Sequence, residues 1–93
     1  MWEKWEHAEN KSIKSEKYKD SAFIDLYKTE DYFEIICSVK DCIMFHTIVI
    51  KNTEAEILKT YEDVKHDLKN IIDNSLYDKE KKADLYMDFI DKW

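Results

Sequence analysis

Two cysteines and three histidines are the side chains of this chain best suited to metal binding or nucleophilic chemistry. Structural zinc sites use cysteine and histidine ligands that usually come in close pairs, such as Cys-x-x-Cys or His-x₃-His. No such pair occurs among Cys37, Cys42, His7, His46 and His66. The sequence therefore predicts no metal site, and nothing in it indicates another cofactor.

A cysteine could instead act as a nucleophile. Cys37 and Cys42 flank an expected tight turn between two strands, and His46 follows in the second strand. Cross-strand neighbours approach within about 5 Å, near enough for a cysteine–histidine pair. No segment beside them supplies an oxyanion loop or a substrate pocket, so we expect a protein that is not an enzyme.

The same two cysteines are compatible with a disulfide or with two buried thiols. Residues 1–17 carry charges every two or three positions and no apolar run, which is typical of neither a signal peptide nor a membrane span. We therefore expect a cytoplasmic protein with no membrane contact, and that compartment favours the thiols.

Carboxylates are the most numerous reactive groups in the chain. Near the C-terminus, Glu80, Asp84, Asp88 and Asp91 recur at steps of four, four and three, which places them on one face of a helix. We call these four residues the acidic stripe. Like charges four residues apart destabilise a helix by about 0.2–0.5 kcal/mol per pair, and aspartate is a weak helix former. This cost suggests a binding role. The alternative is a solvated face that only keeps the protein in solution.

Six further residues extend the predicted binding surface. They are two acids of the preceding helix and two acids and two tyrosines of a predicted hairpin: Asp63, Asp67, Asp25, Glu34, Tyr27 and Tyr32. If Tyr27 faces Tyr32, then Asp25 faces Glu34, an unfavourable pair unless a cation or a basic partner lies between the two carboxylates. The alternative is an ordinary outer sheet face whose acids point into water.

The elements that carry these residues can be located from hydrophobic periodicity. Residues 21–27 and 32–39 alternate with period two and predict the two strands of a hairpin, with Ala22, Ile24 and Leu26 on its apolar face. Residues 42–50 predict a third strand that is apolar, and therefore covered, on both faces. The turn before it contains no Asn-Gly pair, so its register is open by one residue.

Two helices are predicted after the strands. Residues 53–56 read as a capping box, and an apolar stripe follows at helical spacing up to Asn74. Asp78 is suited to cap a last helix whose apolar side contains Leu85, Tyr86 and Phe89. Before residue 20, only a short N-terminal helix through about residue 10 is indicated, followed by a polar connection.

The sequence therefore predicts one α+β domain over residues 1–93. Its parts are an N-terminal segment (1–20), a three-stranded antiparallel β-meander (21–51), and two C-terminal helices packed on one face of the sheet (53–93). A chain of 93 residues buries roughly 65% of its unfolded surface on folding, which supports one modest core.

Composition limits the function classes. The absence of glycine excludes glycine-rich phosphate loops and with them ordinary nucleotide-binding sites. All 15 basic residues are lysine and the net charge is −6, so direct nucleic-acid binding is disfavoured and a basic partner fits better. The bias toward Lys, Ile, Asn and Asp is the one expected of an AT-rich genome, such as that of a low-GC bacterium or its phages.

No stretch matches a family motif. In size, acidity and composition the chain resembles the broad group of small phage-encoded antagonists of bacterial machinery, which includes anti-CRISPR proteins and DNA mimics. That resemblance implies a non-catalytic inhibitor that blocks a basic, nucleic-acid-binding site of a host protein. Alternatives are an acidic immunity protein that neutralises a basic nuclease toxin, and a homodimeric structural subunit.

Overall fold

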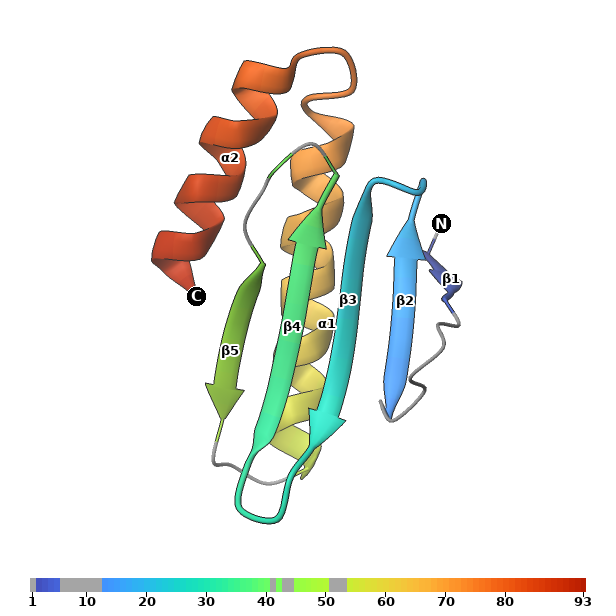
Figure 1. The fold of residues 1–93 in the computed structure, drawn as a ribbon, viewed down its shortest axis with the longest axis vertical. Coiled ribbons are helices and arrows are strands. Elements are labelled where there is room, and N and C mark those ends of the chain that lie inside the picture. Colours follow the sequence, from blue (N-terminus) through green and yellow to red (C-terminus); the bar gives the residue numbers. More distant parts are fainter. Residues whose placement is uncertain (1, 6–12, 41, 43–44, 51–53) are drawn as a thin grey trace.

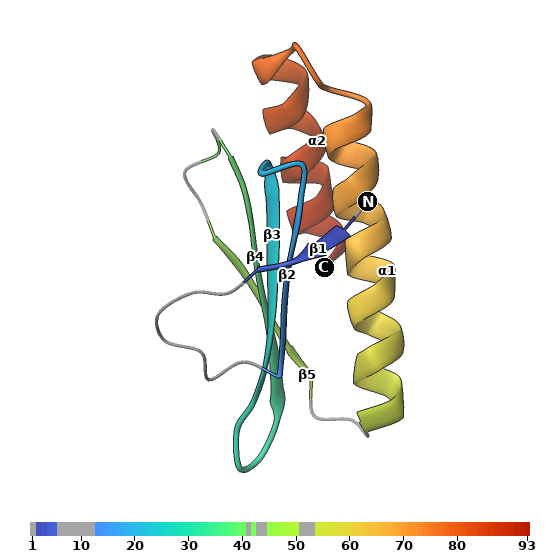
Figure 2. The same ribbon diagram turned by 90° about the vertical axis from the view of Figure 1, so that its right-hand side faces the viewer.

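The computed structural model describes residues 2–5, 13–40, 42, 45–50 and 54–93, with Ile50 described by its backbone only. The fold is α+β, as predicted (Figure 1). Its elements are β1 (Trp2–Lys4), β2 (Lys14–Tyr18), β3 (Ala22–Lys28), β4 (Phe33–Val39), β5 (His46–Ile50), α1 (Glu54–Asp73) and α2 (Lys79–Lys92). The five strands form one antiparallel sheet in sequence order, rather than the predicted three-stranded meander. Both helices cover the same face of this sheet, as expected (Figure 2).

The two additional strands lie where the sequence predicted an N-terminal helix and a polar connection, and that prediction was wrong. β1 pairs with β2, and β2 pairs with β3. The alternation of β2 is hidden because charged side chains occupy its helix-facing positions. Glu16 forms an ion pair with Lys65 of α1, and the Lys14 ammonium lies 5.6 Å from the centre of the Tyr61 ring. Residues 6–10 of the predicted helix lie outside the described part of the chain.

The hairpin of β3 and β4 carries the centre of the core. Its helix-facing side chains alternate as predicted, and Ile24, Leu26 and Ile35 are fully buried. The register differs from the prediction by two residues, because the pairing places Tyr27 opposite Glu34 and Asp25 opposite Ile36. A two-residue shift leaves every side chain on its predicted face.

The loop of this hairpin explains the difference in register. Thr29 and Tyr32 close the loop: the Thr29 hydroxyl donates to the Tyr32 carbonyl oxygen at 2.9 Å and accepts from the Tyr32 N–H at 3.1 Å. Tyr32 is thereby drawn into the loop and removed from the ladder, whereas the sequence pattern had placed it opposite Tyr27.

β5 is an edge strand and is covered on one face only, which corrects the prediction of a doubly covered third strand. Ile48 faces the helices and is buried, whereas 53% of the Val49 surface is exposed on the opposite face. Phe45, just before the strand, is 74% exposed. The open face of the sheet therefore carries apolar side chains without a helix over them.

The two helices follow the predicted pattern closely. α1 buries Ile57, Tyr61, Val64, Leu68, Ile71 and Ile72 and ends at Asp73, next to the predicted Asn74. Thr53 of the expected capping box lies outside the described residues. Asp78 caps α2 as predicted, since its carboxylate accepts from the Lys81 N–H at 3.0 Å. No helix among the described residues is long and apolar enough to cross a membrane.

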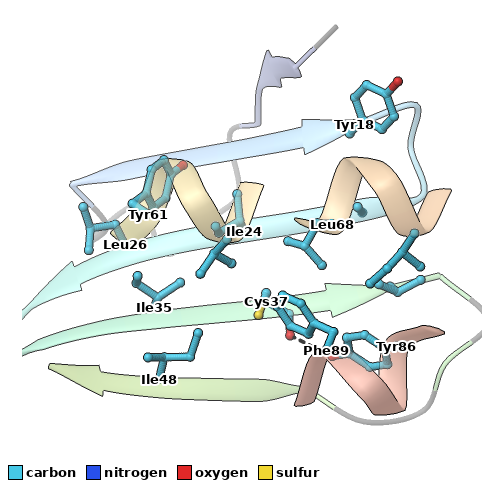
Figure 3. Packing of buried hydrophobic residues seen from close by; sticks show 14 of the residues in the cluster. Tyr18, Ile24, Leu26, Ile35, Cys37, Ile48, Tyr61, Leu68, Tyr86 and Phe89 are labelled. Atoms are coloured by element: carbon cyan, nitrogen blue, oxygen red, sulfur yellow. Dashed lines mark hydrogen bonds between the residues drawn. The ribbon is translucent and has the colours of Figure 1, made fainter. Parts of the chain in front are cut away.

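The core lies between the sheet and the helices (Figure 3). Strand side chains such as Ile24, Ile35 and Cys37 face Leu68 of α1 and Phe89 of α2. The buried Tyr86 hydroxyl of α2 donates to the Cys37 carbonyl oxygen at 3.3 Å, which joins α2 to the sheet. Each fully buried aliphatic side chain contributes about 1.5–3 kcal/mol through apolar burial, so these contacts hold the two layers together.

A cluster around Asp73 fixes the end of α1 to the turn between β2 and β3. Its carboxylate accepts from the Tyr18 hydroxyl at 2.7 Å and forms ion pairs with Lys69 at 3.0 Å and Lys19 at 3.2 Å. The hydrogen bond from Tyr18, aided by the lysines, lowers the pKa of Asp73 to about 2. Lys19 and Asp20 take left-handed backbone conformations, with φ of 52° and 51°. In a chain without glycine, a turn that requires left-handed conformations has to use other residues.

Candidate functional site

The acidic stripe lies on the solvent-facing side of α2. Its four members are all exposed, while Tyr86 and Phe89 on the opposite side of the helix are buried. No hydrogen bond or ion pair within the described chain involves any stripe carboxylate. Lys92, which stands four residues after Asp88, forms its ion pair with α1 instead. The stripe is therefore a row of uncompensated negative charge.

Exposed apolar side chains flank this row. Met87, between Asp84 and Asp91 on the helix surface, is 49% exposed, and Tyr77 in the connection before α2 is fully exposed. Leu76, the neighbour of Tyr77, is also exposed. Aromatic residues and methionine are enriched in the contact regions of protein–protein interfaces, where they act as anchors. The predicted site residues did not include these three side chains.

The predicted acids of α1 differ from the stripe because lysines of the chain itself compensate them. Asp63 forms an ion pair with Lys59 at 3.3 Å. Asp67 accepts two hydrogen bonds at the same oxygen, Oδ2, from Lys92 Nζ at 2.8 Å and Trp93 Nε1 at 3.0 Å. The contacts of Asp67 with Lys92 and Trp93 could not be predicted from the sequence, because these donors lie 25 and 26 residues away along the chain.

The predicted sheet residues lie on the other side of the molecule. The predicted pairing of Asp25 with Glu34 was wrong, since Asp25 is buried and its carboxylate accepts from the Ser15 hydroxyl at 2.6 Å. Glu34 and Tyr27 are half-buried cross-strand neighbours on the open face of the sheet, and Tyr32 is half-buried in the hairpin loop. The ten predicted site residues therefore divide between the helical side and the open sheet face, and the fold does not bring them onto one surface.

Two of the ten, Asp67 and Asp88, meet across a groove between α1 and α2. This groove has a volume of about 200 Å³, and its lining residues are Asp67, Ile71, Leu85, Asp88, Phe89 and Lys92. We call it the interhelical groove. Ile71 and Phe89 are nearly completely buried and Leu85 is half-buried, so its floor is apolar. The two carboxylates and the Lys92 ammonium provide its polar atoms.

The cysteine–histidine pair is present but is poorly suited to catalysis. Cys37 and His46 are cross-strand partners, as expected from their strands. The Cys37 thiol is buried and donates to the His46 backbone carbonyl oxygen at 3.5 Å, while burial raises the pKa of the thiol to about 12. A thiol with this pKa is not a thiolate near neutral pH, and the thiolate is the reactive form. Both cysteines are free thiols.

The side chains that could ligate a metal are also dispersed. Within the described ranges of the chain, no three His, Cys, Asp or Glu residues are grouped so as to hold a metal ion. His66 is exposed on α1, and the His46 ring makes an edge contact with Phe89 at 5.8 Å between centroids.

Comparison of the chain with protein-family models, with curated proteins and with solved structures gives no match. The charges, contacts and exposed side chains described above are therefore the basis for the proposed function.

Proposed function

We propose that this protein is a non-catalytic inhibitor that binds a basic, nucleic-acid-binding surface of another protein through the outer side of α2. The observation that carries the proposal is the acidic stripe, which has four exposed and uncompensated carboxylates beside the exposed side chains of Tyr77 and Met87. Negative charge steers association with a basic surface, and the apolar neighbours supply contact area. The partner is expected in a low-GC bacterium, as a component of defence or nucleic-acid processing.

The stripe differs from the three aspartates of α1 in a way that supports this proposal. Asp63, Asp67 and Asp73 are each held by at least one lysine ammonium of the chain. Three lysines of α2 are exposed, yet none lies within ion-pair distance of a stripe carboxylate. A basic partner would reduce the repulsion between the stripe carboxylates, so the stripe would destabilise α2 less in the complex than in the free protein.

The geometry also limits how far α2 can imitate nucleic acid. Four residues of helix rise about 6 Å, whereas one strand of DNA presents a phosphate about every 3.4 Å. α2 therefore offers roughly half of the linear charge density of one strand. The predicted sheet acids, Asp25 and Glu34, cannot add to it because they belong to β3 and β4, in the other layer of the molecule (Figure 2). Inhibition is proposed to arise from occlusion of a basic site rather than from full imitation of a duplex.

The test compares capture of basic proteins from a low-GC bacterial lysate by the wild type and by two variants of equal net charge. One variant neutralises the stripe (Asp84→Asn, Asp88→Asn and Asp91→Asn), and the other neutralises acids at the hairpin end of the sheet (Glu30→Gln, Asp31→Asn and Glu34→Gln). We expect the stripe variant to lose a nucleic-acid-binding protein that the sheet variant retains, and added nucleic acid to compete with capture. Equal capture by both variants, or capture of acidic proteins only, would refute the proposal.

An acidic immunity protein that neutralises a nuclease toxin would use the same surface and the same physics. The capture experiment separates the two. A captured toxin would cleave nucleic acid once released from this protein, and adding this protein back would stop the cleavage. In the inhibitor proposal, the partner is instead a host protein that can no longer bind its nucleic acid when this protein occupies its basic site.

A homodimeric subunit is favoured by a different observation, the exposed apolar side chains of Val49 on the open face of the sheet and of Phe45 just before β5. A second copy that packed face to face would bury them together with the half-buried Phe23, Tyr27 and Ile36. Sedimentation of the wild type and of Val49→Lys tests this candidate. A dimer that becomes monomeric on substitution supports it, and a wild-type monomer at high concentration rejects it.

A further inference from the structure

We infer that the interhelical groove receives one arginine side chain of the basic partner. This inference rests on the proposed function and makes it more specific, since it names the side chain that the partner inserts and the position where it binds. The groove is the place where the described residues of α1 and α2 combine an apolar floor with carboxylates at the surface.

The lining matches a long side chain with a cationic end. Ile71, Leu85 and Phe89 form an apolar floor, against which the methylene groups of an arginine can be buried. Asp88 is exposed and forms no ion pair with any residue of the described chain. A guanidinium beside Asp88 would donate a charge-assisted hydrogen bond to it, and the negative charge of Asp88 would then be compensated by the partner.

Asp67 provides a second acceptor on the α1 side of the groove. Both of its donors, Lys92 Nζ and Trp93 Nε1, use the oxygen Oδ2, and no described residue donates to Oδ1. The Lys92 side chain is 61% exposed, so its ion pair with Asp67 is screened by solvent and is weak. A partner cation can share Asp67 with Lys92 or displace it at little cost.

Arginine fits this arrangement better than lysine does. The guanidinium is planar and carries several N–H donors in a fixed fork, so it can bridge two carboxylates, whereas an ammonium acts as a single compact charge. The local charge also favours a cation, because two carboxylates, Asp67 and Asp88, line the groove and Lys92 is the single cation among the lining residues. This chain itself contains no arginine, so a lining lysine is the strongest internal competitor.

Trp93 makes the inference testable by NMR, since its indole N–H donates to the carboxylate that the guanidinium would approach. The probe is a blocked pentapeptide, Ala-Ala-Arg-Ala-Ala, titrated into ¹⁵N-labelled protein alongside its lysine and citrulline counterparts. The indole signals of Trp2 and Trp5 serve as internal controls. We expect a saturable shift of the Trp93 signal with the arginine peptide, a weaker response with lysine, and none with citrulline.

Two variants of identical charge provide the matched control. Asp88 lines the groove, whereas Asp84 stands one turn earlier on the same stripe and does not line it. We expect Asp88→Asn to weaken arginine-peptide binding at least threefold and Asp84→Asn to change it less than twofold. Removal of the competing ammonium by Lys92→Met should strengthen binding. All three positions are exposed, so the variants should fold.

The outcomes separate this inference from the proposed function. An unresponsive Trp93 signal, equal effects of Asp84→Asn and Asp88→Asn, or equal binding of citrulline and arginine would overturn the groove as an arginine site. If the stripe variant still loses its basic partner in the capture experiment, the proposed function survives that result. If Trp93 responds to arginine as expected but no basic partner is captured, the groove is an arginine site and the inhibitor proposal fails.

Discussion

Neutralising the acidic stripe should stabilise the protein while it removes the proposed binding surface. In the variant with Asp84→Asn, Asp88→Asn and Asp91→Asn, three like-charge pairs disappear, two at a spacing of four residues and one at a spacing of three. At about 0.2–0.5 kcal/mol per pair, this relief amounts to roughly 0.6–1.5 kcal/mol. Asp91 also lies in the last turn of α2, where a negative charge opposes the helix dipole and costs about 0.3–1 kcal/mol.

The expected gain in the free energy of unfolding is therefore about 1–2 kcal/mol. Asparagine and aspartate have similar helix propensities, so the substitution adds no propensity cost. No ion pair among the described residues is lost, because Lys92 binds Asp67 rather than a stripe residue. The stripe variant should need about 1 M more urea to unfold than the wild type at low ionic strength, with a slope near 1–3 kcal/mol per molar.

The sheet variant with Glu30→Gln, Asp31→Asn and Glu34→Gln is the matched control. Both variants change the net charge from −6 to −3, since each removes three negative charges. A general effect of lower net charge would stabilise them equally, whereas the proposed local repulsion stabilises only the stripe variant. High salt should reduce the difference, because the pairs are exposed and screened. A stripe variant no more stable than the wild type at low salt would refute the reasoning.

Three further predictions follow from the contacts in the fold. Leu68→Ala creates a cavity in the core and should lower the free energy of unfolding by about 2–5 kcal/mol. Leu58 is 37% exposed, so Leu58→Ala should lower the free energy of unfolding much less, and urea unfolding measures both variants. Asp73 has a pKa of about 2 when folded and about 3.9 when unfolded, so its contribution is fully present above about pH 4 and is lost as the pH falls toward 2. The stability difference between the wild type and Asp73→Asn should therefore narrow over this pH range, and a constant difference would contradict the role of this carboxylate. Near pH 8, the native protein should be alkylated at Cys42 and not at Cys37, because Cys37 is buried and burial raises the pKa of its thiol to about 12. Mass spectrometry measures the two rates, and equal rates would disprove this prediction.

The two sides of the molecule suggest separate roles. The outer side of α2 carries negative charge with a few exposed apolar side chains, whereas the open face of the sheet carries Val49 and partly buried aromatic residues. The first surface is suited to a basic partner, and the second is suited to an apolar one, including a second copy. Substitutions on one side should leave binding at the other unchanged, because the core separates them (Figure 2).

The sequence alone determined the elements whose pattern is local. The alternation of residues 22–26 predicted a strand, the helical spacing of apolar residues from Ile57 to Ile72 predicted α1, and Asp78 marked the start of α2. The spacing of the acidic stripe also placed its four carboxylates on one exposed helix face. These features depend on neighbours within a few positions, so periodicity and capping are sufficient to identify them.

Only the tertiary structure decided which charges are compensated and where strands pair. β2 is a strand although Lys14 and Glu16 face the helices, because Tyr61 and Lys65 of α1 provide partners for them. Asp67 is compensated from the far end of α2, and Asp25 is buried by contacts that its predicted register did not contain. The energy of a charge depends on groups that approach it through space, and those groups lie far away along the chain.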